Sequence, residues 1–278
     1  MPHSLPYAAN CSMLFTEVPL LERPSAAAAA GFDAIEFWWP WPDQPVPADR
    51  DVDAFVDAVR DAGVSLIGLN FFAGDLAGPD CGVLSVPARA AEFRDNLDVT
   101  LGLGERLSVR AFNALYGNLV PESSPQEQDE LGVEQLAAAA TAASQIGGTV
   151  LLEPVSGPKP YPLRTADDVI RILDRVQATG AGNIGFLCDL FHLANNGDDI
   201  ERALDSYANR IAHIQIADHP GRGEPGTGSL DLEHYLSRIE QSGYSGHVAL
   251  EYKPTRPTSD SLDWLPRERR SARSDAQS

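Results

Sequence analysis

TVLLE, residues 149–153, is a short apolar run that ends on an acidic residue, and it predicts a buried β-strand with a carboxylate at its mouth. Three later apolar runs also end on a residue whose side-chain oxygen can bind a hard cation, and the four end at Glu153, Asp189, Gln215 and Glu251. A carboxylate in such a place is costly to desolvate unless it is hydrogen-bonded, paired with a cation or bound to a metal ion. Four oxygen-bearing residues in equivalent positions therefore indicate one shared site.

Apolar runs of this kind alternate with amphipathic stretches along the whole chain, which is typical of repeated βα units around a parallel sheet. Strands are predicted at residues 7–11, 34–37, 65–69, 108–113, 149–153, 184–188, 211–216 and 247–251. This number of strands predicts an α/β fold, a (β/α)8 TIM barrel that forms a single domain. We assign residues 1–265 to the barrel and expect residues 266–278, which have little apolar content, to be a flexible C-terminal tail.

The segments between the predicted strands are expected to be helices. Residues 54–59 and 169–173 carry apolar side chains at helical spacing. The alanine-rich stretch 26–30 is expected to form a closely packed helix with Gly31 as its C-cap. Long connections that follow predicted strands lie where TIM-barrel chemistry is found. Two such connections stand out, at residues 38–50 and 154–163.

The composition limits the partners of the protein. Its 278 residues include 21 Lys and Arg against 40 Asp and Glu, and the formal net charge of -19 repels phosphate backbones and anionic lipids. We therefore expect a small-molecule partner, and neither nucleic acid nor membrane. No apolar segment has the length of a membrane span and the three cysteines form no CxxC pair, so a soluble, cytoplasmic protein is predicted. The sequence does not specify the oligomeric state, and a homo-oligomer is one candidate.

The strand-end residues have the chemistry of a metal site. In a parallel barrel the C-terminal ends of the strands converge on the axis, so Glu153, Asp189, Gln215 and Glu251 are predicted to meet. Oxygen donors without a thiolate suit Mg²⁺ or Mn²⁺ better than zinc, and a glutamate can also act as a general base. The alternative is that these residues cap the following helices, as Asp189 before LFHLANN could do. Glutamates are poor N-caps, which favours the shared site.

Three further side chains are candidates for substrate binding. His192 lies three residues after Asp189 in DLFH, where a first helical turn would return it to the barrel mouth. Arg222, in the Gly- and Pro-rich stretch ADHPGRGEPGTG, either grips a substrate carboxylate or is an exposed arginine of an ordinary loop. His213 shares a strand face with Gln215, so it either supports a ligand or is a satisfied core histidine.

The predicted strand at residues 34–37 adds two features. Glu36 is a further inward-facing polar residue that we assign to substrate binding, and its alternative role is a salt bridge to a neighbouring loop. The aromatic cluster FWWPW, residues 37–41, follows that strand and either walls a pocket or only packs.

Several motifs occur in a characteristic order: NCSMLF, GFDAIEF, the AGD of FFAGD, EFRDN, LLEP, DLFH, HIQIAD, RGEPGTG and EYKP. With these motifs the chain resembles the hydroxypyruvate isomerase family, within the broader group of xylose-isomerase-like barrels that includes keto-sugar 3-epimerases. The motifs span nearly the whole chain. The related epimerases tend to carry histidine where this chain has Gln215, which favours the hydroxypyruvate-type group.

The resemblance implies a divalent metal ion, Mg²⁺ or Mn²⁺, bound by the four strand-end residues, with Glu153 and Glu251 also acting as an acid/base pair. Where the family often has HN before AGD, this chain has Leu69 and Asn70, so one polar contact to substrate is expected to be missing and Asn70 is assigned to substrate binding. Val155-Ser156 and Ser229 also depart from the family pattern, which leaves the substrate less certain than the reaction type.

The expected function is therefore a metal-dependent aldose-ketose type isomerase that interconverts hydroxypyruvate and tartronate semialdehyde (2-hydroxy-3-oxopropanoate) through an enediolate. One alternative is a keto-sugar 3-epimerase or another short sugar-acid isomerase of the same barrel group. An alternative of another class is a barrel that binds a sugar acid without turnover. A nuclease of the related fold is disfavoured by the acidic charge and by the shortage of histidines for a multi-zinc cluster.

Overall fold

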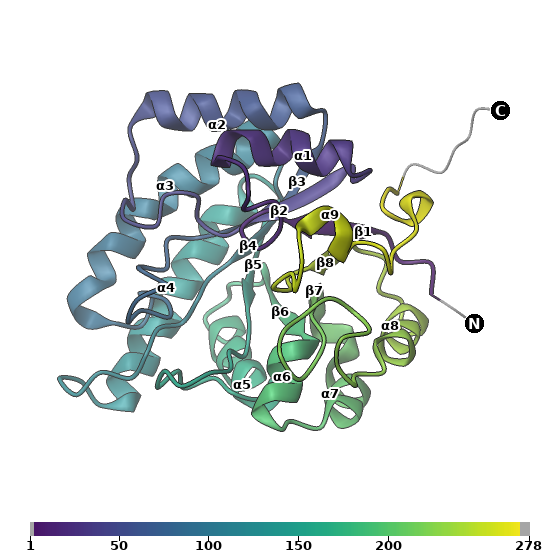
Figure 1. The fold of residues 1–278 in the computed structure, drawn as a ribbon. Coiled ribbons are helices and arrows are strands. Elements are labelled where there is room, and N and C mark those ends of the chain that lie inside the picture. The colour runs from purple at the N-terminus through teal and green to yellow at the C-terminus, as the bar shows by residue number, and fades with distance from the viewer. Residues whose placement is uncertain (1–2, 273–278) are drawn as a thin grey trace.

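A computed structural model describes residues 3–272 and shows a closed barrel of parallel strands in chain order, with β1 paired to β8 (Figure 1). The predicted single-domain (β/α)8 barrel is thereby confirmed in architecture. The strands are β1 (Tyr7–Asn10), β2 (Ala34–Phe37), β3 (Ser65–Asn70), β4 (Ala111–Asn113), β5 (Thr149–Leu152), β6 (Ile184–Asp189), β7 (Ile211–Ile216) and β8 (Val248–Leu250).

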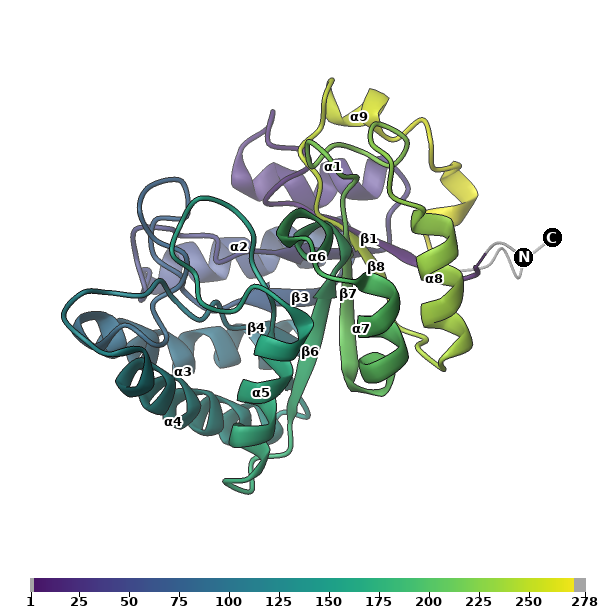
Figure 2. The ribbon, with the colours of Figure 1, turned by 90° about the horizontal axis from the view of Figure 1, so that it is seen from below.

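Helices surround the barrel and connect its strands (Figure 2). The α-helices are α1 (Arg23–Ala29), α2 (Asp49–Ala62), α3 (Ala90–Leu107), α4 (Pro125–Ser144), α5 (Ala166–Gln177), α6 (Leu190–Asn196), α7 (Ile200–Tyr207), α8 (Leu232–Gln241) and α9 (Thr258–Ser261). Short 3₁₀ turns are η1 (Leu20–Glu22), η2 (Pro87–Arg89), η3 (Ala208–Arg210) and η4 (Arg267–Arg269). No helix within residues 3–272 is long and apolar enough to cross a membrane.

Local signals in the sequence set several helix ends. Ser124 and Glu127 form a capping box at the start of α4, and Thr165 and Asp168 form one at the start of α5. The predicted alanine-rich helix is present as α1, and Gly31 follows it with a positive φ of 102°. These caps satisfy backbone groups that the ends of a helix leave without partners.

The fourth strand starts later than predicted. The run at residues 108–113 was expected to be extended throughout, but α3 continues to Leu107 and Ser108 ends it in a left-handed conformation with φ of 59°. Strand β4 therefore begins at Ala111. The apolar residue Val109 lies between the two elements and is buried. Its apolar side chain made this run resemble a strand in the sequence.

The side chains of strand β7 alternate between the large apolar cluster and the polar inside of the barrel. Ile214 and Ile216 belong to the large apolar cluster, whereas His213 and Gln215 point to the opposite face of the strand. Inside the barrel, Gly68 on β3 is paired in register with Glu36 on β2. A Cβ atom on Gly68 would lie 3.1 Å from Glu36 Oε2, so the glycine leaves room for this carboxylate.

The chain does not leave the barrel at residue 266, where a flexible tail was expected to begin. Arg267 and Arg270 donate hydrogen bonds to the carbonyl oxygens at the C-terminal end of α1, at 2.8 and 2.9 Å. The chain after η4 thus lies against the first helix, and Figure 1 shows this yellow segment close to the purple N-terminal one. The rest of the predicted tail, residues 273–278, lies outside the described residues.

Candidate active site

Polar side chains gather where the strands end, at one end of the barrel. Asn10 is paired in register with Glu36, and Asp189 with Gln215. Glu153 and Glu251 directly follow β5 and β8. These residues are all buried, so the barrel does bring together strand-end side chains that are distant in sequence.

Glu153 is one member of a compact cluster. One side-chain ligand atom from each of Glu153, Asp189 and His192 lies within 4.8 Å of the other two. Asn113 donates to Glu153 Oε1 at 2.6 Å, while Glu153 Oε2 is buried without a hydrogen-bond partner among the described residues. Burial and the nearby Asp189 raise the pKa of Glu153 to about 8, although Asn113 and Arg222 oppose that rise.

Asp189 caps the helix that follows it, which is one of the two roles expected from its sequence position. Its Oδ1 accepts hydrogen bonds from the backbone N–H groups of Phe191 at 2.8 Å and His192 at 3.1 Å, so it caps α6. Its Oδ2 lies 3.7 Å from Nε2 of His192. The capping interaction fixes the carboxylate and leaves its second oxygen for the cluster.

His192 is held as a neutral hydrogen-bond donor. The backbone N–H of Ser156 donates to its Nδ1 at 3.0 Å, so the ring hydrogen of the neutral form is on Nε2. Burial lowers the pKa of His192 to about 4, more than Asp189 raises it. The Nε2–H group therefore points a donor, rather than a lone pair, toward the cluster.

Glu36 holds several of its neighbours in place. Its Oε1 accepts from Asn10 Nδ2 at 2.8 Å and from Gln215 Nε2 at 2.7 Å, and its Oε2 bonds with His213 Nε2 at 2.7 Å. Burial acts to raise the pKa of Glu36, but His213 and these hydrogen bonds outweigh it and lower the pKa. Glu36 and His213 contact each other and are absent from the cavity lining, so their arrangement matches the supporting role that was left open for His213.

The contact with Glu36 also orients Gln215. Because the side-chain amide N–H of Gln215 donates to Glu36, its Oε1 is directed elsewhere, and this oxygen is buried without a partner among the described residues. An amide oxygen of this kind is a suitable ligand for a hard cation.

Glu251 lies apart from the three-residue cluster and is held by donors from three directions. Arg222 Nη2 donates to its Oε2 at 3.0 Å, and Trp38 Nε1 and Asn10 Nδ2 donate to its Oε1. Burial raises the pKa of Glu251 well above its usual range, although Arg222 opposes the rise. Arg222 is thus engaged with a protein carboxylate, whereas the two roles considered from the sequence were a grip on a substrate carboxylate and an exposed position in a loop.

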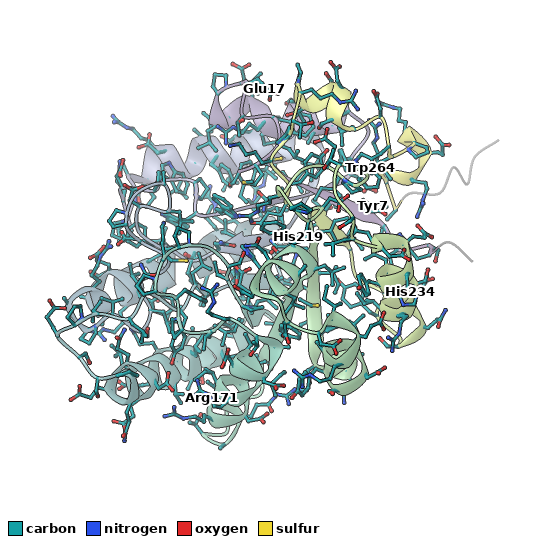
Figure 3. All side chains as sticks on the ribbon, turned by 60° about the horizontal axis from the view of Figure 1, so that its bottom comes forward. Tyr7, Glu17, Arg171, His219, His234 and Trp264 are labelled. Atoms are coloured by element: carbon teal, nitrogen blue, oxygen red, sulfur yellow. The ribbon has the colours of Figure 1, made fainter. Side chains whose placement is uncertain are left out.

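A cavity of about 170 Å³ opens onto these groups. Of the predicted site residues, Glu153, Glu251, His192, Arg222 and Asn70 line it, whereas Asp189 and Gln215 do not. The loop 217–228 contributes Arg222 to the cavity lining, and Figure 3 marks its His219 toward the middle of the molecule. Such a cavity is smaller than the roughly 300–1,000 Å³ pockets that bind drug-sized ligands.

Sequence reasoning missed three residues of the site, Asn10, Asn113 and Lys159. Asn10 and Asn113 end β1 and β4, so the same strand-end pattern could have identified them. Trp38 belongs to the aromatic cluster that was expected either to wall a pocket or only to pack; it lines the cavity and donates to Glu251. Lys159 also lines the cavity, and no motif distinguished it.

The residues present fit a divalent cation. Two buried oxygens, Glu153 Oε2 and Gln215 Oε1, have no hydrogen-bond donor among the described residues, which is an unfavourable arrangement unless another group binds them. Asp189 Oδ2 offers a third oxygen beside Glu153. Because His192 presents an N–H, the donor set consists of oxygens, as Mg²⁺ and Mn²⁺ prefer.

Comparison with known proteins finds a matching family and several similar proteins that are named as isomerases. A model of the xylose isomerase-like TIM barrel family matches residues 24–268. A Streptomyces coelicolor protein provisionally named hydroxypyruvate isomerase is 53% identical over 269 residues, which cover 95% of this chain and 96% of the relative. A 2-oxo-tetronate isomerase of Haemophilus influenzae is 31% identical over 262 residues, with 93% and 97% covered. Further curated relatives carry one or the other name.

Among solved structures, one named AP endonuclease, family 2, from Brucella melitensis is similar throughout. It has a TM-score of 0.84 and 31% sequence identity, and the match covers 95% of this chain and 98% of that one.

Proposed function

Because the chain belongs to the xylose isomerase-like TIM barrel family and is an isomerase similar to named hydroxypyruvate and 2-oxo-tetronate isomerases, we propose that it interconverts hydroxypyruvate and tartronate semialdehyde with a divalent metal ion. The predicted resemblance to the hydroxypyruvate isomerase family is confirmed by these relatives. The observation that carries the proposal is that Glu153 and Glu251, two buried glutamates with raised pKa values, line the same small cavity.

In this proposal the metal ion is held by Glu153, Asp189, Gln215 and Glu251. A bound ion would polarise the carbonyl and hydroxyl oxygens of the substrate, which would acidify the C–H bond of the hydroxyl-bearing carbon and offset the negative charge that develops on the oxygens. Two of the four oxygens that this assignment needs, Glu153 Oε2 and Gln215 Oε1, have no hydrogen-bond donor among residues 3–272. Arg222 and Trp38 already donate to the carboxylate of Glu251, so this carboxylate would have to accept their hydrogen bonds and bind the metal ion at the same time.

The two glutamates move the proton. Isomerisation breaks a C–H bond at C3 of hydroxypyruvate and forms one at C2, while a hydroxyl proton passes from the oxygen on C3 to the oxygen on C2. One glutamate takes the carbon-bound proton and the other delivers one to the neighbouring carbon. Both glutamates line the cavity, so each carboxylate can reach the reacting carbons of a bound substrate. His192 donates its Nε2–H to a substrate oxygen.

The size of the cavity supports a short substrate. A cavity of about 170 Å³ suits a molecule of a few carbons, and the four-carbon 2-oxo-tetronate named for one relative is the next candidate. A longer keto sugar for 3-epimerisation fits this space less well. A nuclease, as the name of the Brucella melitensis structure says of that protein, is disfavoured by the net charge of -19.

Proton exchange from heavy water tests this proposal. We expect the wild-type protein with Mg²⁺ or Mn²⁺ to incorporate deuterium at C3 of hydroxypyruvate and to form tartronate semialdehyde, both followed by NMR. A chelator should stop both, and added metal should restore them. Metal-dependent exchange with 2-oxo-tetronate alone would move the proposal to that substrate, and a protein that binds hydroxypyruvate without exchange would contradict it.

A further inference from the structure

The cavity has an acidic side and a loop side. Glu153 and Glu251 form the acidic side at the strand ends. Leu76, Pro158 and Lys159 line it from the loops that follow β3 and β5. A substrate that places its reacting carbons against the glutamates therefore directs its other end toward these loops. If that end is a carboxylate, its burial in the cavity is costly unless a cation or hydrogen-bond donors replace the water that it loses.

Two cationic side chains line the cavity among residues 3–272, and Arg222 is already engaged. Its Nη2 donates to Glu251 Oε2 at 3.0 Å and its Nε to the backbone oxygen of Glu251 at 3.4 Å. Its guanidinium carbon also lies 5.4 Å from the ring centre of Phe191. Arg222 is thus fixed against Glu251 and neutralises that carboxylate, which leaves Lys159 as the cation without a carboxylate partner in the cavity lining.

Lys159 is held in place by the opposite loop but keeps a donor. Its Nζ donates to the backbone oxygens of Leu76 at 2.9 Å and Asp80 at 2.5 Å. An ammonium group has three donors, so one N–H remains. Because the two contacts join the loop after β3 to the loop after β5, the charge is positioned by both loops rather than by a free side chain.

The position of Cys81 supports the placement of this charge. The Cys81 thiol lines the cavity, and it is close enough to Glu153, Lys159 and Arg222 to be influenced by all three. Burial and, to a smaller extent, Glu153 raise its pKa to about 12, although the charges of Lys159 and Arg222 oppose the rise. Lys159 therefore acts on the same small volume as the proposed catalytic glutamate.

We propose that Lys159 binds the carboxylate of the substrate and selects 2-keto acids over uncharged ketoses. This inference rests on the proposed isomerase function, and it assigns to Lys159 the role that the sequence had suggested for Arg222. The remaining N–H of the ammonium group donates to the carboxylate in a charge-assisted hydrogen bond. Because the same group links the two loops, the carboxylate is bound at the point where these loops meet over the cavity.

The test compares two ligands that differ only at the group in question. Hydroxypyruvate carries a carboxylate where dihydroxyacetone carries a hydroxymethyl group. For Lys159→Met we expect the KM for hydroxypyruvate to rise about tenfold or more, because a charge-assisted hydrogen bond is lost. The inhibition constant of dihydroxyacetone against hydroxypyruvate should change by less than about twofold. Lys159→Arg, which keeps the charge, should recover part of the lost affinity.

Arg164→Met is the matched control. Arg164 donates to the backbone oxygen of Gly157 at 3.3 Å, so it holds the same loop without lining the cavity. This variant removes a positive charge and a loop contact, and its KM for hydroxypyruvate should stay near the wild-type value. Equal weakening of both ligands in Lys159→Met would show that Lys159 only joins the loops, and no change in either would equally overturn the inference. A wild-type protein without turnover of any 2-keto acid would instead refute the isomerase proposal itself.

Discussion

Replacing Glu153 by glutamine is expected to lower the rate of hydroxypyruvate isomerisation by roughly 10²- to 10⁴-fold, the usual contribution of a general acid or base. Glutamine keeps the shape of the side chain and can still accept a hydrogen bond from Asn113, but it cannot accept a proton. The formation of tartronate semialdehyde should fall, and the deuterium exchange at C3 should fall with it if Glu153 is the glutamate that takes the proton from C3. The two rates are measured by NMR in heavy water with saturating Mn²⁺.

The stability of the same variant separates a catalytic role from a structural one. The pKa of Glu153 rises from 4.5 to about 8 because the carboxylate is buried near Asp189. Between these pH values the folded metal-free protein keeps a proton that the unfolded chain loses, so the free energy of unfolding falls as the pH rises. Glu153→Gln removes this loss, and its thermal midpoint at pH 8 should equal or exceed that of the wild type. A variant that is active, or inactive only because it unfolds, would contradict the assignment.

Glu251→Gln is expected to have a rate effect of similar size, roughly 10²- to 10⁴-fold, because the second proton transfer requires the second carboxylate. The rates of deuterium exchange and of product formation in this variant also show which glutamate takes the proton from C3. If Glu251 acts first, exchange at C3 and product formation are both lost. If it acts second, exchange at C3 continues while product formation falls. Product formation at the wild-type rate would require the two-base scheme to be abandoned.

Glu224→Gln is the control for this variant. Glu224 is also a buried glutamate at this end of the barrel, but it accepts hydrogen bonds from Thr255 at 2.6 and 3.0 Å and does not line the cavity. The same chemical change at this position should leave turnover within a few-fold of the wild-type rate. The comparison therefore attributes the effect of Glu251→Gln to its place in the cavity.

The barrel was predictable because its signals are local. Apolar runs and amphipathic stretches identify each βα unit, and closure of the barrel then places all the strand ends together. This is why Glu153 and Asp189, 36 positions apart by their residue numbers, could be assigned to one site before their contacts were known. The start of β4 was wrong because the left-handed conformation at Ser108 leaves no clear signal in the sequence.

The contacts that the sequence did not reveal depend on loops. Arg222 was expected to face the substrate, and it bonds to Glu251 because the loop 217–228 folds back over the barrel mouth. Lys159 reaches the loop after β3 from the loop after β5, a contact across 83 and 79 positions of the chain. Residue type and spacing do not specify such contacts, since the paths of both loops depend on many weak interactions.

Titration of the protein with Mn²⁺ tests the central claim, that the strand-end oxygens hold one divalent ion, most directly. Asp189→Asn is the comparison, because asparagine keeps the N-cap of α6 but removes the charge beside Glu153. The wild-type protein is expected to bind one ion per chain, more tightly at pH 8 than at pH 6 because the ion displaces the proton of Glu153. Asp189→Asn should bind it about 100-fold more weakly. Absence of binding to the wild type, or equal binding to both proteins, would contradict the account.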